Sequence, residues 1–222
     1  MENPRFRIGA NRHAGTTDAT GRRDGRAAGS ILTNELWAKA PRSGGEIETA
    51  ERELRVRLPN DLTAFLQLGD EAEGFVGGAY LAMWPVAELA ELNHLIRTNE
   101  FAPDLVFFAT DGGLEGYGVS RDRGTFVNVP LIGMGVIGRD IVGSTFEDFL
   151  WSLARKYPTS GEGPAPDPDP TRFGLIAHEV TPIIFGGSPT DPTNKTLIPL
   201  KKYAELVGWW NEQVRLSSSS GA

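Results

Sequence analysis

The sequence predicts an α+β fold, and three observations support this class. A helical apolar period runs over residues 47–58, a block of short apolar segments follows over residues 105–129, and a second helical period occupies residues 144–153. Helices segregated from a block of antiparallel strands are typical of α+β proteins, whereas strands and helices alternate in α/β proteins. With 40% hydrophobic and 23% charged residues, the chain of 222 residues can bury a real core.

The first helices are predicted from apolar spacing. Ile47, Ala50, Leu54 and Leu58 recur at steps of three and four residues, and Pro59 ends that period because the residue before proline leaves the α region. A short helix from 61 to 69 follows. After an extended, glycine-interrupted segment over 74–84, a third helix carries an apolar stripe of Val86, Leu89, Leu92 and Ile96.

The strands are predicted over 105–108, 117–119 and 125–129. Asp111 precedes two glycines, and we expect its carboxylate to serve that turn. Ser144 and Glu147 have the spacing of a capping box, which predicts a helix with Phe146, Phe149, Leu150 and Leu153 on its apolar side. Residues 133–138 match G-x-G-x-x-G, but no helix begins directly after them, so we predict a loop without nucleotide binding.

Composition divides the chain into five parts. Residues 1–45 are glycine- and arginine-rich and are expected to be a mostly disordered tail, and residues 46–157 are expected to form the main domain. A proline-rich linker is predicted over 158–171, a small compact module over 172–216 and a Ser/Gly tail over 217–222.

Charge and composition limit the classes of function. Residues 46–155 contain 8 basic and 18 acidic side chains, a formal net charge of −10, which disfavours nucleic acid as a partner and favours a basic protein. The chain has no cysteine, no signal-peptide pattern and no apolar run of membrane length, so we expect a cytoplasmic protein that uses no membrane. The scarce histidines lack metal-ligand spacing, and nothing over 46–155 has a catalytic pattern, so we expect no metal, no cofactor and no enzyme activity.

The order of motifs over 46–157 resembles the SUKH superfamily, which includes a fungal cell-wall assembly regulator and many bacterial immunity proteins. The resemblance rests on Ile47 to Glu51, Leu58 to Leu66, Phe107 to Gly113, Tyr117 to Val119 and Ser144 to Leu150. It implies a curved antiparallel sheet flanked by helices, without catalysis.

For a bacterial protein, the resemblance implies stoichiometric binding and neutralisation of a cognate polymorphic toxin, often a nuclease. The acidity of the domain agrees with this function, because nuclease domains carry basic substrate clefts. We expect the toxin to be contacted by exposed acids on loops, for which the candidates are Asp70, Glu71, Glu73, Glu115 and Asp122.

The C-terminal module resembles the ββα-metal unit of HNH nucleases in a degenerate form. His178 and Asn194 match the positions of the general base and of the asparagine that orients it. The metal-ligand positions do not match, because Ala177 precedes His178 and the expected last histidine falls near Tyr203. The resemblance therefore implies a vestigial unit; the other reading is a small ββα-like appendage in which His178 has no such role.

Two other classes of function stay open at this point. One is a metal-dependent HNH-like nuclease that uses His178 and carries a regulatory SUKH-type domain. The other is a general scaffold or regulator with several partners. The sequence leaves the toxin, the oligomeric state and the role of the arginine-rich tail open.

Overall fold

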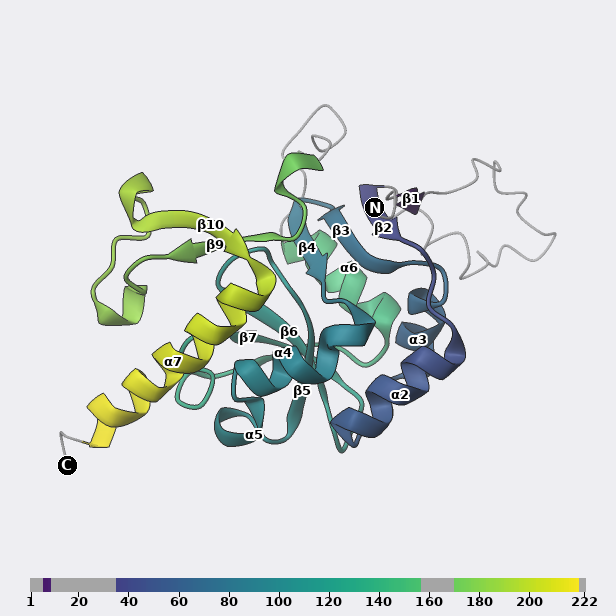
Figure 1. Ribbon diagram of the computed structural model, residues 1–222, viewed down its shortest axis with the longest axis horizontal. Helices are drawn as coiled ribbons and strands as arrows, with labels where there is room; N and C mark the ends of the chain where they lie inside the picture. The colour runs from purple at the N-terminus through teal and green to yellow at the C-terminus, as the bar shows by residue number, and fades with distance from the viewer. Residues whose placement is uncertain (1–5, 9–34, 157–169, 220–222) are drawn as a thin grey trace.

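The computed structural model describes residues 6–8, 35–156 and 170–219 (Figure 1). Most of the linker predicted over 158–171 and most of the predicted N-terminal tail lie outside these residues; the last two linker positions, Pro170 and Thr171, lie within a short 3-10 helix over Pro170–Arg172. Within them, the α+β class is confirmed, with one large antiparallel sheet, helices on both of its faces and a smaller two-stranded sheet.

The large sheet is a meander, because its eight strands lie side by side in the order in which they occur in the sequence. They are β1 (Phe6–Ile8), β2 (Glu35–Lys39), β3 (Asp70–Val76), β4 (Ala79–Met83), β5 (Leu105–Thr110), β6 (Glu115–Ser120), β7 (Phe126–Pro130) and β8 (Asp140–Gly143). Register shifts interrupt the pairings β2–β3, β5–β6 and β7–β8, and such irregularities bend strands.

The front face of the sheet in Figure 1 carries α2 (Gly44–Leu54), η1 (Val86–Glu88), α4 (Leu89–Leu95) and α5 (Thr98–Phe101). A capping box of Ser43 and Glu46 opens α2, and Arg55 closes it in the left-handed conformation. Buried Asn93 fixes α4 to β5, since its amide donates to the Phe107 carbonyl at 2.8 Å and accepts from the Phe107 N–H at 2.9 Å. The helix predicted after Pro85 is thus confirmed.

The opposite face is covered by α6 (Phe146–Lys156), which packs beside α3 (Asn60–Leu66). Phe149 is fully buried, and its ring lies 5.2–5.7 Å from the rings of four neighbours: Phe108, Tyr117, Phe126 and Phe146. The predicted apolar side of α6 is confirmed. Its cap differs by one residue, because the Thr145 hydroxyl accepts the Asp148 N–H at 3.0 Å, where we predicted Ser144 and Glu147.

Residues 170–219 form a ββα unit at one side of the large sheet (Figure 1). It consists of η2 (Pro170–Arg172), β9 (Leu175–Glu179), η3 (Ile183–Phe185), η4 (Pro192–Asn194), β10 (Lys195–Pro199) and α7 (Leu200–Ser219). One continuous apolar core joins this unit to the rest of the chain, and the unit contributes Ile176, Tyr203, Ala204, Val207 and Val214. The predicted ββα-like order of elements in the appendage is therefore confirmed, and the unit packs against the large sheet through this shared core.

Polar contacts hold the ββα unit in place as well. Asn211 of α7 accepts the Gly133 N–H at 2.7 Å and donates to the Leu131 carbonyl at 2.8 Å. The Arg97 guanidinium lies 3.0 Å from the carboxylate of Glu212. A Cβ at Gly208 would overlap the carbonyl oxygen of Leu95, so α7 crosses the end of α4 at backbone contact.

Two boundaries and one strand differ from the predictions. Part of the predicted tail over 1–45 is ordered, since β2 pairs with β3 and buries Leu36 and Ala38 completely. At the other end, α7 continues to Ser219, into the predicted tail over 217–222, because the hydroxyls of Ser217 and Ser218 bond to the Val214 carbonyl. Strand β8 was not predicted, because none of its four residues is buried and pairing with β7 defines it.

Candidate functional site

Two of the predicted toxin-contacting acids, Asp70 and Glu73, are buried in strand β3. Asp70 is completely inaccessible; its carboxylate accepts from Arg42 Nε at 2.7 Å and from the Val86 N–H at 3.1 Å. Burial raises the pKa of Asp70, an effect that Arg42 only partly opposes. The prediction that Asp70 is an exposed loop acid is wrong, because its carboxylate ties the segment before α2 to η1.

Glu73 connects the large sheet to the ββα unit. Its carboxylate accepts from the Tyr80 hydroxyl at 2.9 Å and from the Gly174 N–H at 3.0 Å, and its side chain is 3% exposed. A buried carboxylate with two donors is a structural element. Glu73 therefore lies out of reach of a partner, and the prediction of an exposed acid is wrong here too.

Glu71 lies between these two acids and is partly buried. Its φ of 51° is in the left-handed region, and its carboxylate lies 2.6 Å from Lys39 Nζ. Since a side chain that is 15% exposed and ion-paired offers little free charge to a partner, Glu71 is a weaker candidate than its loop-like sequence indicated.

Glu115 and Asp122 lie at opposite ends of β6. Asp122 is exposed in the β6–β7 turn, where the Ser120 hydroxyl donates to it and hydrogen bonding lowers its pKa. Glu115 begins the strand and is partly buried; burial and the nearby charge of Asp111 raise its pKa. Six strand residues extend about 17–20 Å, so the two carboxylates do not belong to one small patch. The predicted turn role of Asp111 is confirmed, because its Oδ1 accepts from the N–H groups of Gly113 and Glu115.

His178 is buried in β9, with its ring 5.9 Å from that of Tyr203 on α7. Burial lowers the pKa of His178, so the neutral imidazole is favoured, although the Glu179 charge acts in the opposite direction. The Tyr203 hydroxyl donates to the Gly113 carbonyl, which places this pair against the β5–β6 turn.

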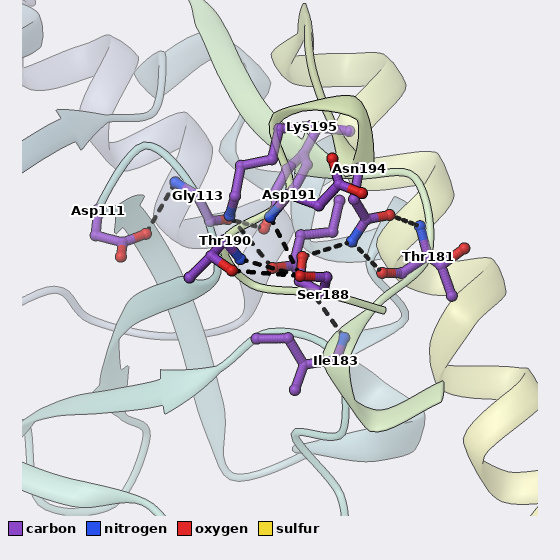
Figure 2. Close-up of polar contacts among 11 residues, drawn as sticks. Asp111, Gly113, Thr181, Ile183, Ser188, Thr190, Asp191, Asn194 and Lys195 are labelled. Carbon is purple, nitrogen blue, oxygen red and sulfur yellow. Dashed lines mark hydrogen bonds and ion pairs between the residues drawn. The ribbon is translucent and has the colours of Figure 1, made fainter. Parts of the chain in front are cut away.

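Asn194, the other residue of the HNH resemblance, braces a loop (Figure 2). Its Oδ1 accepts the Thr181 N–H at 2.8 Å, and its Nδ2 donates to the carbonyls of Thr181 at 2.9 Å and of Ser188 at 3.0 Å. Both hydrogens of the Asn194 amide are thus donated to backbone carbonyls, and neither is donated to His178. In the described ranges, no three His, Asp or Glu side chains are placed to hold a metal ion.

The buried carboxylate of Glu179 shapes the segment that follows it. It accepts the Ile183 N–H at 3.1 Å and lies 3.4 Å from Lys195 Nζ. This contact helps to position η3, in which Ile183 and Ile184 are each 46% exposed.

An apolar surface runs from the loop 133–137 across η3 to α7. The side chains of Ile137 and Ile184 both lie next to Gly133, the Phe185 ring lies 5.0 Å from Trp210, and Trp210 lies 4.6 Å from Trp209. Several members are well exposed: Val136 (62%), Ile137, Ile183, Ile184 and Trp209 (53%). Contiguous exposed apolar residues of this kind mark sites of contact with other molecules.

Only part of this apolar surface left a signal in the sequence. The adjacent Trp209 and Trp210 cannot both face the core from one helix, and in the structure Trp210 packs against Phe185 while Trp209 stays exposed. The participation of the loop 133–137 follows from tertiary contacts alone.

A comparison with protein-family models finds that the SMI1 / KNR4 family (SUKH-1) matches residues 41–152. The matched segment begins just before α2 and ends within α6, so it contains β3 to β8 and leaves the ββα unit outside. No curated protein matches the chain. Within the described ranges, no helix is both long and apolar enough to cross a bilayer.

Proposed function

The chain belongs to the SMI1 / KNR4 family (SUKH-1), and from this premise we propose that it is a non-enzymatic immunity protein. It binds a cognate polymorphic toxin with a basic, nuclease-type domain and neutralises it by stoichiometric contact in the cytoplasm. The family is associated with immunity proteins and with cell-wall regulators, and the features of this chain favour the first of these roles.

The observation that carries the proposal is the exposed apolar surface of Val136, Ile137, Ile183, Ile184 and Trp209. Exposed tryptophan and isoleucine side chains become energetically dominant when a partner buries them. Burying one large apolar side chain contributes about 1.5–3 kcal/mol, so a few of these residues supply a large part of a stable interface.

The charge of the family domain supports a basic partner. Residues 46–155 have a formal net charge of −10, and Asp122 and Asp140 are exposed acids on this domain. A negative surface raises the rate of encounter with a basic domain, whereas the apolar contact sets how slowly the complex dissociates. The acids therefore act mainly through steering.

The test uses the full chain as bait in a lysate of the native organism, beside the variant Ile183→Asp/Ile184→Asp. We expect wild type to retain a protein in near-equal amount and the variant to lose most of it. Leu68→Asp is the matched control, because Leu68 is 61% exposed and lies between α3 and β3, outside the apolar surface.

The captured protein must also behave as a toxin. Expressed alone in a bacterial host it should arrest growth, and co-expression of the chain should restore growth. Capture of several unrelated proteins without growth arrest would favour the scaffold class. Cleavage of plasmid DNA by the chain with Mg²⁺, lost in His178→Ala, would overturn the non-enzymatic reading.

A further inference from the structure

A polar cleft of about 490 Å³ lies where α2 ends, α4 passes and β6 turns towards β7. It is separate from the apolar surface described above. Its lining residues are Glu53, Leu54, Arg55, Ala90, Asn93, His94, Asn99 and Arg121. Two arginines and only one acid therefore line a cleft in a domain whose formal net charge over 46–155 is −10.

Arg121 is partly buried and has only backbone partners. Its Nε donates to the Leu105 carbonyl at 3.1 Å and its Nη1 to the Leu54 carbonyl at 2.7 Å. In the described part of the chain, no carboxylate lies within ion-pair distance of it, and burial lowers its pKa with no opposing acid. A guanidinium has five N–H donors, so three remain for a ligand.

Arg55 is held at the cleft by an uncommon backbone conformation. Its φ of 55° and ψ of 46° are left-handed, and its own N–H closes α2 by bonding to the carbonyls of Arg52 and Glu51. Glycine or asparagine adopts this conformation more easily. The exposed Arg55 side chain has no carboxylate within ion-pair distance among the described residues.

The negative end of α2 explains part of this arrangement. Cations are favoured at helix C-termini, and Arg121 satisfies the Leu54 carbonyl there. One guanidinium is enough for that role. Asp104, whose carbonyl accepts the Arg121 N–H, does not pair with the Arg121 guanidinium, because its carboxylate lies 2.5 Å from Arg139.

We propose that this cleft binds a small molecule through an oxyanion, a phosphate or a carboxylate group, held between Arg55 and Arg121. Guanidinium groups bind both kinds of oxyanion through paired N–H donors. The exposed amide of Asn99 and the exposed imidazole of His94 supply further polar contacts at the rim. The volume is within the usual range of small-molecule sites, and a cleft of this size suits a small ligand better than a protein surface.

The test is a titration of the full chain with pyrophosphate and, separately, with citrate, by isothermal calorimetry at constant ionic strength. We expect saturable binding of at least one of them, and the stronger of the two identifies phosphate or carboxylate as the preferred group. Arg55→Asn should weaken this binding about tenfold or more, because it removes one guanidinium from a backbone position that asparagine tolerates.

Arg52→Asn is the matched control, since it removes the same charge from the last turn of α2 outside the cleft lining. It should change the affinity less than about twofold. Glu53→Gln should tighten binding, because Glu53 is the only acid of the lining.

Any of three outcomes would overturn the proposal. The first is that neither anion saturates the chain up to millimolar concentration, and the second is that Arg52→Asn and Arg55→Asn weaken anion binding equally. The third is that hexaglutamate binds saturably while neither small anion binds. None of them depends on the toxin, so this result is independent of the proposed function.

Discussion

The family domain and the C-terminal ββα unit differ in which side chains they leave on the surface. Of the ten large apolar residues that are exposed in the described ranges, six lie in residues 170–219: Val180, Ile183, Ile184, Leu197, Trp209 and Leu216. Residues 35–156 are more than twice as long and contribute four. Of these four, Val136, Ile137 and Ile141 lie on the stretch 131–143 between β7 and α6.

The difference indicates that the two regions have different structural roles. The domain buries its aromatic residues around Phe149, uses Asp70 to hold its own segments together and uses Glu73 to join itself to the ββα unit. The ββα unit is too small to bury all of its apolar residues, although it is anchored by Tyr203 and Asn211. We infer that the appended unit provides contact area and the domain provides the scaffold and the charge.

The largest expected effect tests the packing of the domain. Phe149→Ala should destabilise the protein by about 3–5 kcal/mol, because Phe149 is fully buried among four aromatic rings. Phe185→Ala, which removes a half-buried ring from Trp210, should cost about 1 kcal/mol. Urea unfolding measures both, and equal losses would show that the two regions are packed alike.

A smaller effect tests how the two regions are joined. Gly208→Ala should cost about 1–3 kcal/mol, since the added Cβ would overlap the Leu95 carbonyl and push α7 from α4. Gly45→Ala is the matched control, because a Cβ there meets nothing within 4 Å in a helix and should be neutral or stabilising. Thermal unfolding and amide exchange of β9 and β10 provide the measurement. Unchanged exchange in Gly208→Ala would contradict the close helix crossing.

The smallest expected effect is a difference in pH response. Because burial lowers the pKa of His178 from its usual 6.5, its contribution to stability is present above pH 6.5 and is lost as the pH falls through the lower folded value. The raised pKa values of Asp70 and Asp111 act in the opposite sense: their contribution is present below the unfolded value of 3.8 and is lost as the pH rises through the folded value.

Acidification from pH 7.5 to 5.5 should therefore destabilise the ββα unit before the domain. His178→Gln should reduce this loss, and His94→Gln, at an exposed position of α4, should leave it unchanged. Amide exchange of β9 and of β5, recorded over this pH range, compares the two regions directly. Identical pH profiles of wild type and His178→Gln would exclude His178 as the cause.

Much of the element order followed from local patterns. The apolar period of α2, the run of β5 and the aromatic side of α6 were predicted because each buries one face against a core, and periodicity reports that directly. Strand β2 was missed because it precedes α2 in a glycine- and arginine-rich stretch and is defined by its pairing with the distant β3. The short, exposed β8 left no periodic signal for the same reason.

The candidate site was predicted less well than the fold. Asp70, Glu71 and Glu73 have the same chemistry in the sequence, yet Asp70 and Glu73 are buried and Glu71 is ion-paired. Their exposure depends on Arg42, Tyr80 and Gly174, which are brought to them by the sheet and by the ββα unit. Only Asp122 was correctly predicted as a fully exposed loop acid.

The sequence by itself determined the α+β class and the acidic character of the domain, because these depend on composition and on local periodicity, and its resemblances to known families indicated the family and the ββα form of the C-terminal unit. The tertiary structure alone decided which acids are accessible, that Ile137 meets Ile184, and that Arg55 and Arg121 share a cleft. The physical reason is that burial and contact between residues far apart in the chain are properties of packing, whereas the charge or hydrophobicity of one residue is fixed before the chain folds.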